Sequence, residues 1–454
     1  MSGEALPMSP NKRKLITKIP LIYKAIFFGY FIFAIFNLLG IADNDYVRTV
    51  LQIILVVVVS VFYIRQVWKR DCRWAYIIAY VFRLGLLLFS VYGRRFGMLP
   101  FDGSDTEYFY SGVFERRDHI SYGNDSLVTL TVWLSYLLGD ARLIYQYIML
   151  LIAMAGIRAT DRILQLLGIN KNIKYIILVI TAIFPYFAMS GVIYTREAVV
   201  SSGVAISLLL VILYLKETES RSRYVYLFMG IGLLMIVSLF HAAPIALIPG
   251  YLIFILLYDF KADRVIISRK SLVLCLSIAI LLCAIVFIAF KINPFAFEKL
   301  RGISDVKTIA RRFMFDSNLE AGSSYAQYVG DSDTWGRLIL YTPARLFYGM
   351  FAPLPWEWRG IADAITFFLN SLFYMVVYFV AIVDVFRKKY WKNFNKLFFV
   401  MLICSSVMVG WGSVAFGTAI RHRDKFFLLF VILMALELRG KDKGLLIENT
   451  DSKC

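Results

Sequence analysis

The stretch Gly191-Val-Ile-Tyr-Thr-Arg-Glu-Ala198 joins two long apolar runs, Tyr175–Ser190 and Val199–Leu215. Each run is about long enough to cross the hydrocarbon core of a bilayer. The join places an adjacent cation and anion, Arg196 and Glu197, at the membrane surface, where ionised groups are costly unless they are paired or functional. Two interpretations follow. Either the two side chains form an ion pair with each other that closes a tight turn, or Arg196 faces a cavity and meets an anionic substrate.

The composition excludes a soluble globular protein. Of the 454 residues, 60% are hydrophobic, whereas soluble domains contain roughly 45–50% apolar residues. The net charge of +18 would suggest a nucleic-acid partner in a soluble chain, but most Lys and Arg residues lie in short segments between apolar runs, as the positive-inside rule describes. The sequence therefore predicts an all-α polytopic transmembrane bundle, formed as a single integral-membrane domain over residues 1–454, with no nucleic-acid partner.

The apolar runs predict roughly twelve membrane spans. The basic N-terminus, with Asn11-Lys-Arg-Lys14, is predicted to be cytoplasmic, and the even number of spans then places both termini there. The first run lacks a small-residue cleavage site and is expected to remain as an anchor. The predicted spans are Leu21–Ile41, Val47–Ile64, Trp74–Tyr92, Leu143–Ile157, Tyr175–Ser190, Val199–Leu215, Tyr224–Phe240, one that starts near Pro244, Ser271–Phe290, Ile365–Val385, Leu397–Trp411 and Phe426–Leu438.

Two long polar segments, residues 93–140 and 291–362, are predicted to be extracytoplasmic. Within the first, Leu127–Leu138 is too short for an ordinary span and suits a re-entrant or interfacial helix. The second contains a predicted amphipathic helix, Ser304–Phe315, and the sequence Pro353-Leu-Pro-Trp-Glu-Trp358. Proline and tryptophan together are typical of a segment at the membrane–water interface.

Arginines at the predicted outer face run against the positive-inside bias. They are Arg196, between two spans, and Arg421 and Arg423, just before the last span. The planar guanidinium binds phosphate oxygens through two hydrogen bonds, so several arginines from different helices would suit a lipid diphosphate. The alternative for Arg421 and Arg423 is that they extend to lipid headgroups. Arg83, inside a predicted span, is expected either to pair with a carboxylate in the bundle or to line the same cavity.

The candidate catalytic groups are Asp102, Asp105, Glu197 and His241. Glycosyl transfer from a lipid diphosphate needs a base that takes the proton of the acceptor hydroxyl, and Asp102 or Asp105 is a candidate for it. The alternative is that these aspartates form a turn. His241 is interpreted as a proton carrier or as a hydrogen-bonded histidine at a helix end.

No metal or cofactor is expected. The three histidines, His119, His241 and His422, do not cluster in the sequence, and no spacing of His, Asp or Glu is typical of a metal site. The chain also has no phosphate-binding glycine loop of the P-loop type. An ATP-driven reaction is therefore not predicted.

Four features carry a resemblance to a known family. They are Gly103-Ser-Asp105 with Tyr108, Tyr194-Thr-Arg-Glu197, Phe240-His241 before a proline-started span, and Arg421-His-Arg423 before the last span. In these features the chain resembles the bacterial repeat-unit polymerases of the Wzy/EpsG type, which make O-antigen, capsule or exopolysaccharide.

The resemblance implies an enzyme of the bacterial cytoplasmic (inner) membrane that works without nucleotide, cofactor or metal. It would take undecaprenyl-diphosphate-linked oligosaccharide units in the outer leaflet and transfer the growing glycan onto the next unit. Its partners would be the lipid-linked oligosaccharide, membrane lipid, and other assembly proteins such as a flippase and a chain-length regulator. Substrate handling would involve Arg196 and Arg421, and extend to Arg311 and Arg312.

Two other functions stay open. One is a different glycosyltransferase that uses lipid-linked sugars, or an O-antigen ligase. The other is a lipid-linked oligosaccharide flippase or transporter. A transporter is expected to carry charged residues along a path through the bundle and often has internal repeats, whereas here the unusual charges gather at one predicted face and no repeat is visible.

Overall fold

The chain is described from a computed structural model. The described residues are 21–41, 44–96, 106–107, 109–110, 126–217, 220–241, 243–259, 264–265, 273, 277, 325–329, 335–387, 393–413 and 415–451. They are almost entirely helical, so the predicted all-α class is confirmed. Within this part of the chain the strands are β1 (Tyr258–Asp259) and β2 (Arg264–Val265), which pair antiparallel.

The helices follow the apolar runs closely. In chain order they are α1 (Leu21–Leu38), α2 (Asp45–Trp68), α3 (Arg73–Tyr92), the 3-10 turn Gly93–Phe96, α5 (Ser126–Leu138), α6 (Arg142–Leu166), α7 (Lys171–Ile183), α8 (Pro185–Ser190), α9 (Arg196–Lys216), α10 (Ser220–Phe240), the 3-10 turn Ala243–Leu247, α11 (Ile248–Leu257), α14 (Ala326–Val329), α15 (Trp335–Phe351), the 3-10 turn Pro355–Glu357, α16 (Ile361–Thr366), the π-helical turn Phe367–Ser371, α17 (Leu372–Arg387), α18 (Asn393–Trp411), α19 (Phe416–Asp424) and α20 (Phe427–Asp451).

Seven helices in the described part of the chain are long and apolar enough to cross a membrane. They cover Asp45–Val67, Arg73–Tyr92, Arg142–Leu166, Arg196–Lys216, Ser222–Phe240, Ile361–Asp384 and Phe394–Trp411. Shorter apolar helices cover Ile26–Leu38, Ser126–Leu138 and Ala243–Leu252. Length and composition thus indicate a multi-pass membrane protein, while the number of roughly twelve spans stays a prediction. The predicted span Ser271–Phe290 and the helix Ser304–Phe315 fall almost wholly or wholly outside the described residues.

The predicted span Tyr175–Ser190 is broken in two. α7 ends at Ile183 and α8 begins at Pro185, with Phe184 extended between them at φ −60° and ψ 111°. Proline has no N–H to donate and its ring clashes with the preceding turn, so the residue before it leaves the helical conformation. Carbonyl oxygens near the end of α7 therefore need donors from elsewhere.

Arg83 of α3 supplies those donors. Its side chain is fully buried, and its guanidinium donates to the carbonyl oxygens of Ala182 at 2.9 Å and Thr181 at 3.2 Å. The carbon of the guanidinium also lies 5.2 Å from the ring centre of Phe187 in α8. Arg83 thus joins α3 to the break between α7 and α8. Its hydrogen bonds go to backbone carbonyl oxygens, where the sequence predicted either a carboxylate partner or a cavity.

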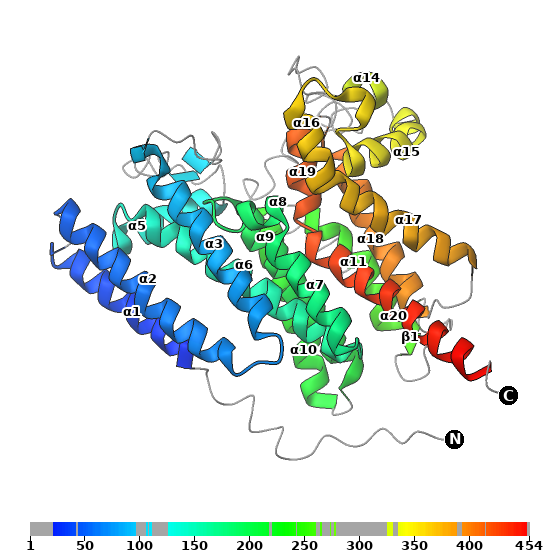
Figure 1. Ribbon diagram of the computed structural model, residues 1–454, viewed down its shortest axis with the longest axis horizontal. Helices are drawn as coiled ribbons and strands as arrows, with labels where there is room; N and C mark the ends of the chain where they lie inside the picture. The colour runs from blue at the N-terminus through cyan, green and yellow to red at the C-terminus, as the bar shows by residue number, and fades with distance from the viewer. Residues whose placement is uncertain are drawn as a thin grey trace.

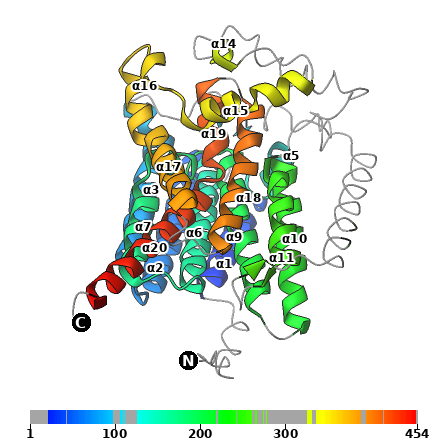
Figure 2. The ribbon, with the colours of Figure 1, turned by 90° about the vertical axis from the view of Figure 1, so that its right-hand side faces the viewer.

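The bundle has two distinct ends (Figures 1 and 2). The C-terminal part of α20 and the turn between α2 and α3 lie at one end, which we call the lower end as drawn in Figure 1. The short helices α14, α16 and α19 lie at the opposite, upper end, together with α15. Between the ends, α6 and α9 form the most buried pair of apolar helices. Gly156 and Ser202 are in close contact there, since a Cβ atom on Gly156 would lie 2.9 Å from the Cα of Ser202.

Candidate functional site

Glu197, in the first turn of α9, is the centre of an ion-pair cluster at the upper end. Its side chain is only 3% exposed. Its Oε1 accepts hydrogen bonds from Arg421 Nε at 3.3 Å and from Arg421 Nη2 at 3.2 Å, and it lies 3.4 Å from Lys425 Nζ. The carboxylate therefore connects α9 to Arg421 of α19 and to Lys425, which follows α19, and its ion pairs are with these two side chains and not with the neighbouring Arg196.

Arg196 connects the start of α9 to the end of α10. Its Nη1 donates to the carbonyl oxygen of Phe240 at 3.5 Å, and its guanidinium carbon lies 5.1 Å from the ring centre of Phe109. Three cations are thus gathered at the start of α9, with Glu197 as the carboxylate that two of them share. We call Arg196, Glu197, Arg421 and Lys425 the cationic cluster. It carries two net positive charges, from three cations and one carboxylate.

Two histidines lie together beside the cluster. His241 follows the last residue of α10, and its ring centre is 4.9 Å from that of His422 in α19, at an interplanar angle of 70°. His241 Nδ1 accepts the backbone N–H of Ala243 at 3.2 Å. In the neutral imidazole that bond assigns the proton to Nε2, which is then a hydrogen-bond donor. The histidines are distant in the sequence but adjacent in space.

The helical geometry of α19 separates its two arginines. Arg421 and Lys425 are four residues apart and so lie on one face of the helix, whereas Arg423 is two residues from each and points to the other side. Arg423 is fully buried. Its hydrogen bonds go to Asn370 Oδ1 at 2.7 Å, Met350 O at 2.7 Å, Ala352 O at 2.9 Å and Ser371 Oγ at 2.9 Å. Arg423 therefore holds α19 against the end of α15 and the π-helical turn, and it does not join the cationic cluster.

Burial shifts the pKa values of the ionisable side chains at the end of α19 toward their neutral forms. It lowers the pKa of Lys425 to about 8, although the neighbouring Glu197 acts in the opposite direction. Burial also lowers the pKa of Arg421. On the same helix, burial raises the pKa of Asp424 to about 6, against the opposing effect of Arg423. A further anion would stabilise the charged form of these cations, because they have lost water and share one carboxylate.

The structure brings together part of the predicted site. Arg196, Glu197, His241 and Arg421 lie in one region, while Arg83 and Arg423 are held elsewhere by backbone carbonyls and polar side chains. Asp102, Asp105, Arg311 and Arg312 lie outside the described residues.

The sequence reasoning missed Lys425 and His422 as site residues. The spacing of Arg421 and Lys425 by four residues was a signal for Lys425, because residues four apart share a helix face. No pattern in the sequence pointed to the contact between His241 and His422, which depends on how α10 and α19 meet.

Within the described residues, no group of three or more His, Cys, Asp or Glu side chains is placed to hold a metal ion. No protein-family model, no curated protein and no solved structure matches this chain.

Proposed function

We propose that the chain polymerises undecaprenyl-diphosphate-linked oligosaccharide units into O-antigen, capsule or exopolysaccharide in the bacterial cytoplasmic membrane. The observation that carries the proposal is the cationic cluster, in which Arg421 and Lys425 pair with the buried Glu197 and Arg196 is the residue next to it, at one end of an apolar bundle. A diphosphate on a long prenyl chain has the charge to bind these cations and the apolar tail to remain in the bilayer. Such a substrate would reach the cluster from one leaflet.

In this function the upper end faces outward. Many cations lie at the lower end, Lys69 and Arg70 in the turn after α2 and Arg158 and Lys174 on α6 and α7, and positive charge at one end of the spans is typically cytoplasmic. The proposal includes both termini in the cytoplasm, roughly twelve spans, and the segments 93–140 and 291–362 on the outer side.

The reaction exchanges one bond at the anomeric carbon of the growing glycan. The bond from that carbon to the diphosphate oxygen breaks, and undecaprenyl diphosphate leaves with the electron pair. A hydroxyl oxygen of the next lipid-linked unit forms the new bond to the carbon, and its proton passes to a base. Cations at the leaving diphosphate stabilise the negative charge that develops as the bond breaks.

Each cluster residue has a separate part in this scheme. Arg196 and Arg421 bind the diphosphate, and Lys425 adds positive charge behind Arg421. Glu197 is a positioning residue, because its buried carboxylate already accepts from Arg421 and pairs with Lys425. His241 donates a hydrogen bond from Nε2 to a substrate oxygen. For the base we propose Asp105 or Asp102, on the sequence argument alone.

The test replaces the chromosomal copy with variants in the strain that makes the glycan. With Arg196→Ala or Arg421→Ala, the surface glycan should consist of single repeat units in place of a ladder of lengths. The matched control is Arg359→Ala: this arginine, just before α16, is 47% exposed and pairs with Asp363 at 3.0 Å, so its loss should leave the ladder unchanged.

Two outcomes contradict the proposal. A normal ladder from Arg421→Ala, with normal protein levels in the membrane, would remove the cluster from the reaction. Loss of all surface glycan in a deletion strain, single-repeat units included, would indicate transport or ligation in place of polymerisation.

A further inference from the structure

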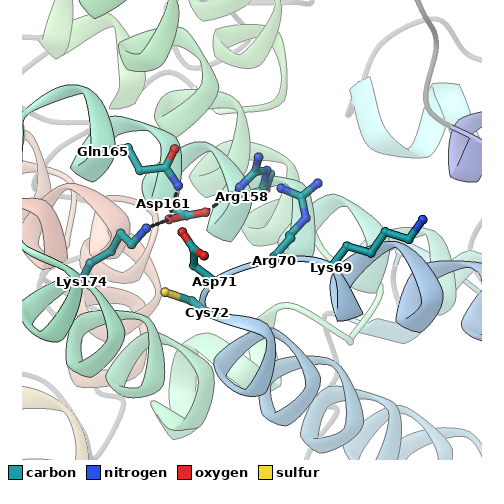
Figure 3. Close-up of a pocket in the computed structure, with 8 residues that line it drawn as sticks. All are labelled: Lys69, Arg70, Asp71, Cys72, Arg158, Asp161, Gln165 and Lys174. Atoms are coloured by element: carbon teal, nitrogen blue, oxygen red, sulfur yellow. Dashed lines mark hydrogen bonds and ion pairs between the residues drawn. The ribbon is translucent and has the colours of Figure 1, made fainter. Parts of the chain in front are cut away.

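A charged pocket lies at the lower end, opposite the cationic cluster (Figures 1 and 3). It is formed by the turn between α2 and α3, the last turns of α6, and the start of α7. Its charged lining consists of Lys69, Arg70, Asp71, Arg158, Asp161 and Lys174. None of these residues contacts the substrate in the function proposed above.

A buried carboxylate fixes two of the cations in place. Asp161 is 2% exposed. It lies 2.5 Å from Arg158 Nη1 and 3.4 Å from Lys174 Nζ, and it accepts hydrogen bonds from Tyr76 and Gln165 at 2.7 and 3.0 Å. Figure 3 shows Arg158, Lys174 and Gln165 converging on it. With four donors on one carboxylate, Asp161 is saturated and serves as the framework of the pocket.

The framework compensates the charge of Arg70 only in part: Asp161 and Tyr76 raise its pKa against burial and Arg158, and its guanidinium carbon lies 5.9 Å from the ring centre of Tyr76. Arg70 forms no ion pair with any described residue, and in Figure 3 its guanidinium lies beside that of Arg158. Burial and the like charge of Arg158 both lower the pKa of Arg70. The lining as a whole has four cations and two carboxylates, which leaves two positive charges. An anion between Arg70 and Arg158 would relieve their repulsion.

The surroundings of the pocket point to a lipid as the carrier of that anion. Trp68 and Trp74 flank the turn, are about half exposed, and touch edge to face with ring centres 5.7 Å apart. Tryptophan gathers at the level of lipid headgroups. Along α2, Val57 and Val61 are exposed apolar side chains suited to contact lipid tails. These side chains would place the pocket at headgroup depth.

The backbone favours a phosphate in the same place. α3 begins at Arg73, and its N-cap residue, Cys72, makes no side-chain capping bond. The N–H of Arg73 donates to the carbonyl oxygen of Arg70 at 3.3 Å, and the N–H groups that follow it in the first turn of a long helix attract phosphate. Basic pockets between membrane helices bind the head groups of anionic lipids in other proteins.

We propose that this pocket binds the phosphate of an anionic membrane lipid, with Arg70 as its principal ligand and Arg158 and Lys174 as supporting cations. The site is independent of the polymerase function, because it lies at the other end of the bundle. Asp71, an exposed carboxylate at the rim, opposes binding and limits the affinity.

The experiment measures lipid binding to the purified full chain in detergent by native mass spectrometry, titrating phosphatidylglycerol and, separately, phosphatidylcholine. Arg70→Gln should weaken phosphatidylglycerol binding about fivefold, and Asp71→Asn should strengthen it by a similar factor, since one charge near the headgroup changes in each. Arg73→Gln is the matched control. Its guanidinium stacks on Trp68 at 5.2 Å, outside the pocket lining, so binding should stay unchanged.

The opposite signs for Arg70→Gln and Asp71→Asn separate a binding role from a structural one, because a misfolded variant does not bind more lipid. If Arg70→Gln does not fold, Asp71→Asn still tests the binding role, because Asp71 is exposed. Equal losses from Arg70→Gln and Arg73→Gln would overturn the proposal in favour of diffuse attraction, as would equal binding of the two lipids. Displacement of phosphatidylglycerol by inorganic phosphate of similar affinity would overturn the lipid assignment and identify a site for soluble phosphate.

Discussion

Glu197 and Arg421 are 224 residues apart in the chain, yet Glu197 Oε1 and Arg421 Nη2 lie 3.2 Å apart. Lys425 reaches the same oxygen at 3.4 Å, and its side chain is 1% exposed. The start of α9 and the end of α19 are thus joined through a carboxylate almost removed from water. Removing one partner of a buried ion pair destabilises the fold strongly, because the other charge is then buried without water and without a counter-charge.

A double-mutant cycle on Glu197 and Lys425 should reveal that destabilisation. Glu197→Gln is expected to lower the free energy of unfolding by about 3–5 kcal/mol, because it leaves the buried Lys425 without its carboxylate. Lys425→Met should cost less, because Arg421 still pairs with Glu197. The double variant should lose less than the sum, by about 0.5–3 kcal/mol. Chemical denaturation in detergent measures all four proteins. Strictly additive losses would show that the two groups do not interact.

The two arginines of α19 should behave differently. Arg423→Met removes a fully buried guanidinium that satisfies two carbonyl oxygens and two side chains, so it should destabilise the protein by about 3–5 kcal/mol. Arg421→Met should cost about 1 kcal/mol or less, because the side chain is 41% exposed and Lys425 remains beside Glu197. The fraction that stays folded after heating in detergent compares them directly. Equal losses would contradict the division of roles on this helix.

The helical class could be predicted from the sequence, because an apolar run long enough to cross a membrane indicates a helix without any knowledge of its tertiary contacts. The prediction failed where local chemistry interrupted a run. Pro185 lies inside the apolar stretch Tyr175–Ser190, which hydropathy alone predicts as one continuous span. The helix is interrupted there, because proline ends α7 and leaves carbonyl oxygens to which Arg83 donates.

The candidate site was predictable only in part, for a geometric reason. Arg196 and Glu197 are neighbours in the chain, which suggested a mutual ion pair as one interpretation. Successive side chains on a helix point about 100° apart, so they face different partners. Arg196 meets the end of α10, and Glu197 meets α19. Which distant segment lies on each side is decided by the packing of the bundle, and no local pattern encodes it.

Close packing of α6 against α9 should depend on Gly156. A Cβ atom there would lie 2.9 Å from the Cα of Ser202 and 2.5 Å from its Oγ, so the two helices would have to separate. Small residues let membrane helices approach closely, and overpacking costs about 1–3 kcal/mol. Gly156→Ala should therefore lower the melting temperature. The control is Gly232→Ala in α10, where nothing lies within 4 Å of the added atom. Similar melting temperatures for the two variants would contradict the close contact.

The charge of Lys425 should make binding of undecaprenyl diphosphate sensitive to pH. Its pKa is lowered by burial to about 8, so above that value the cluster loses one of its three cations and affinity should fall. Titrating the lipid onto purified protein at several pH values from about 6 to about 10 measures this. Lys425→Arg should remove the step, since arginine stays charged throughout.

Stability should change in the opposite direction, which separates loss of affinity from unfolding. Between about 8 and the ordinary Lys value of 10.5, the unfolded chain binds more protons at Lys425 than the folded chain does. The contribution of this lysine to the free energy of unfolding therefore rises with pH over that range. Weaker diphosphate binding combined with an unchanged or higher melting temperature would assign the effect to the lost charge. A step at the same pH in Lys425→Arg would show that another group is responsible.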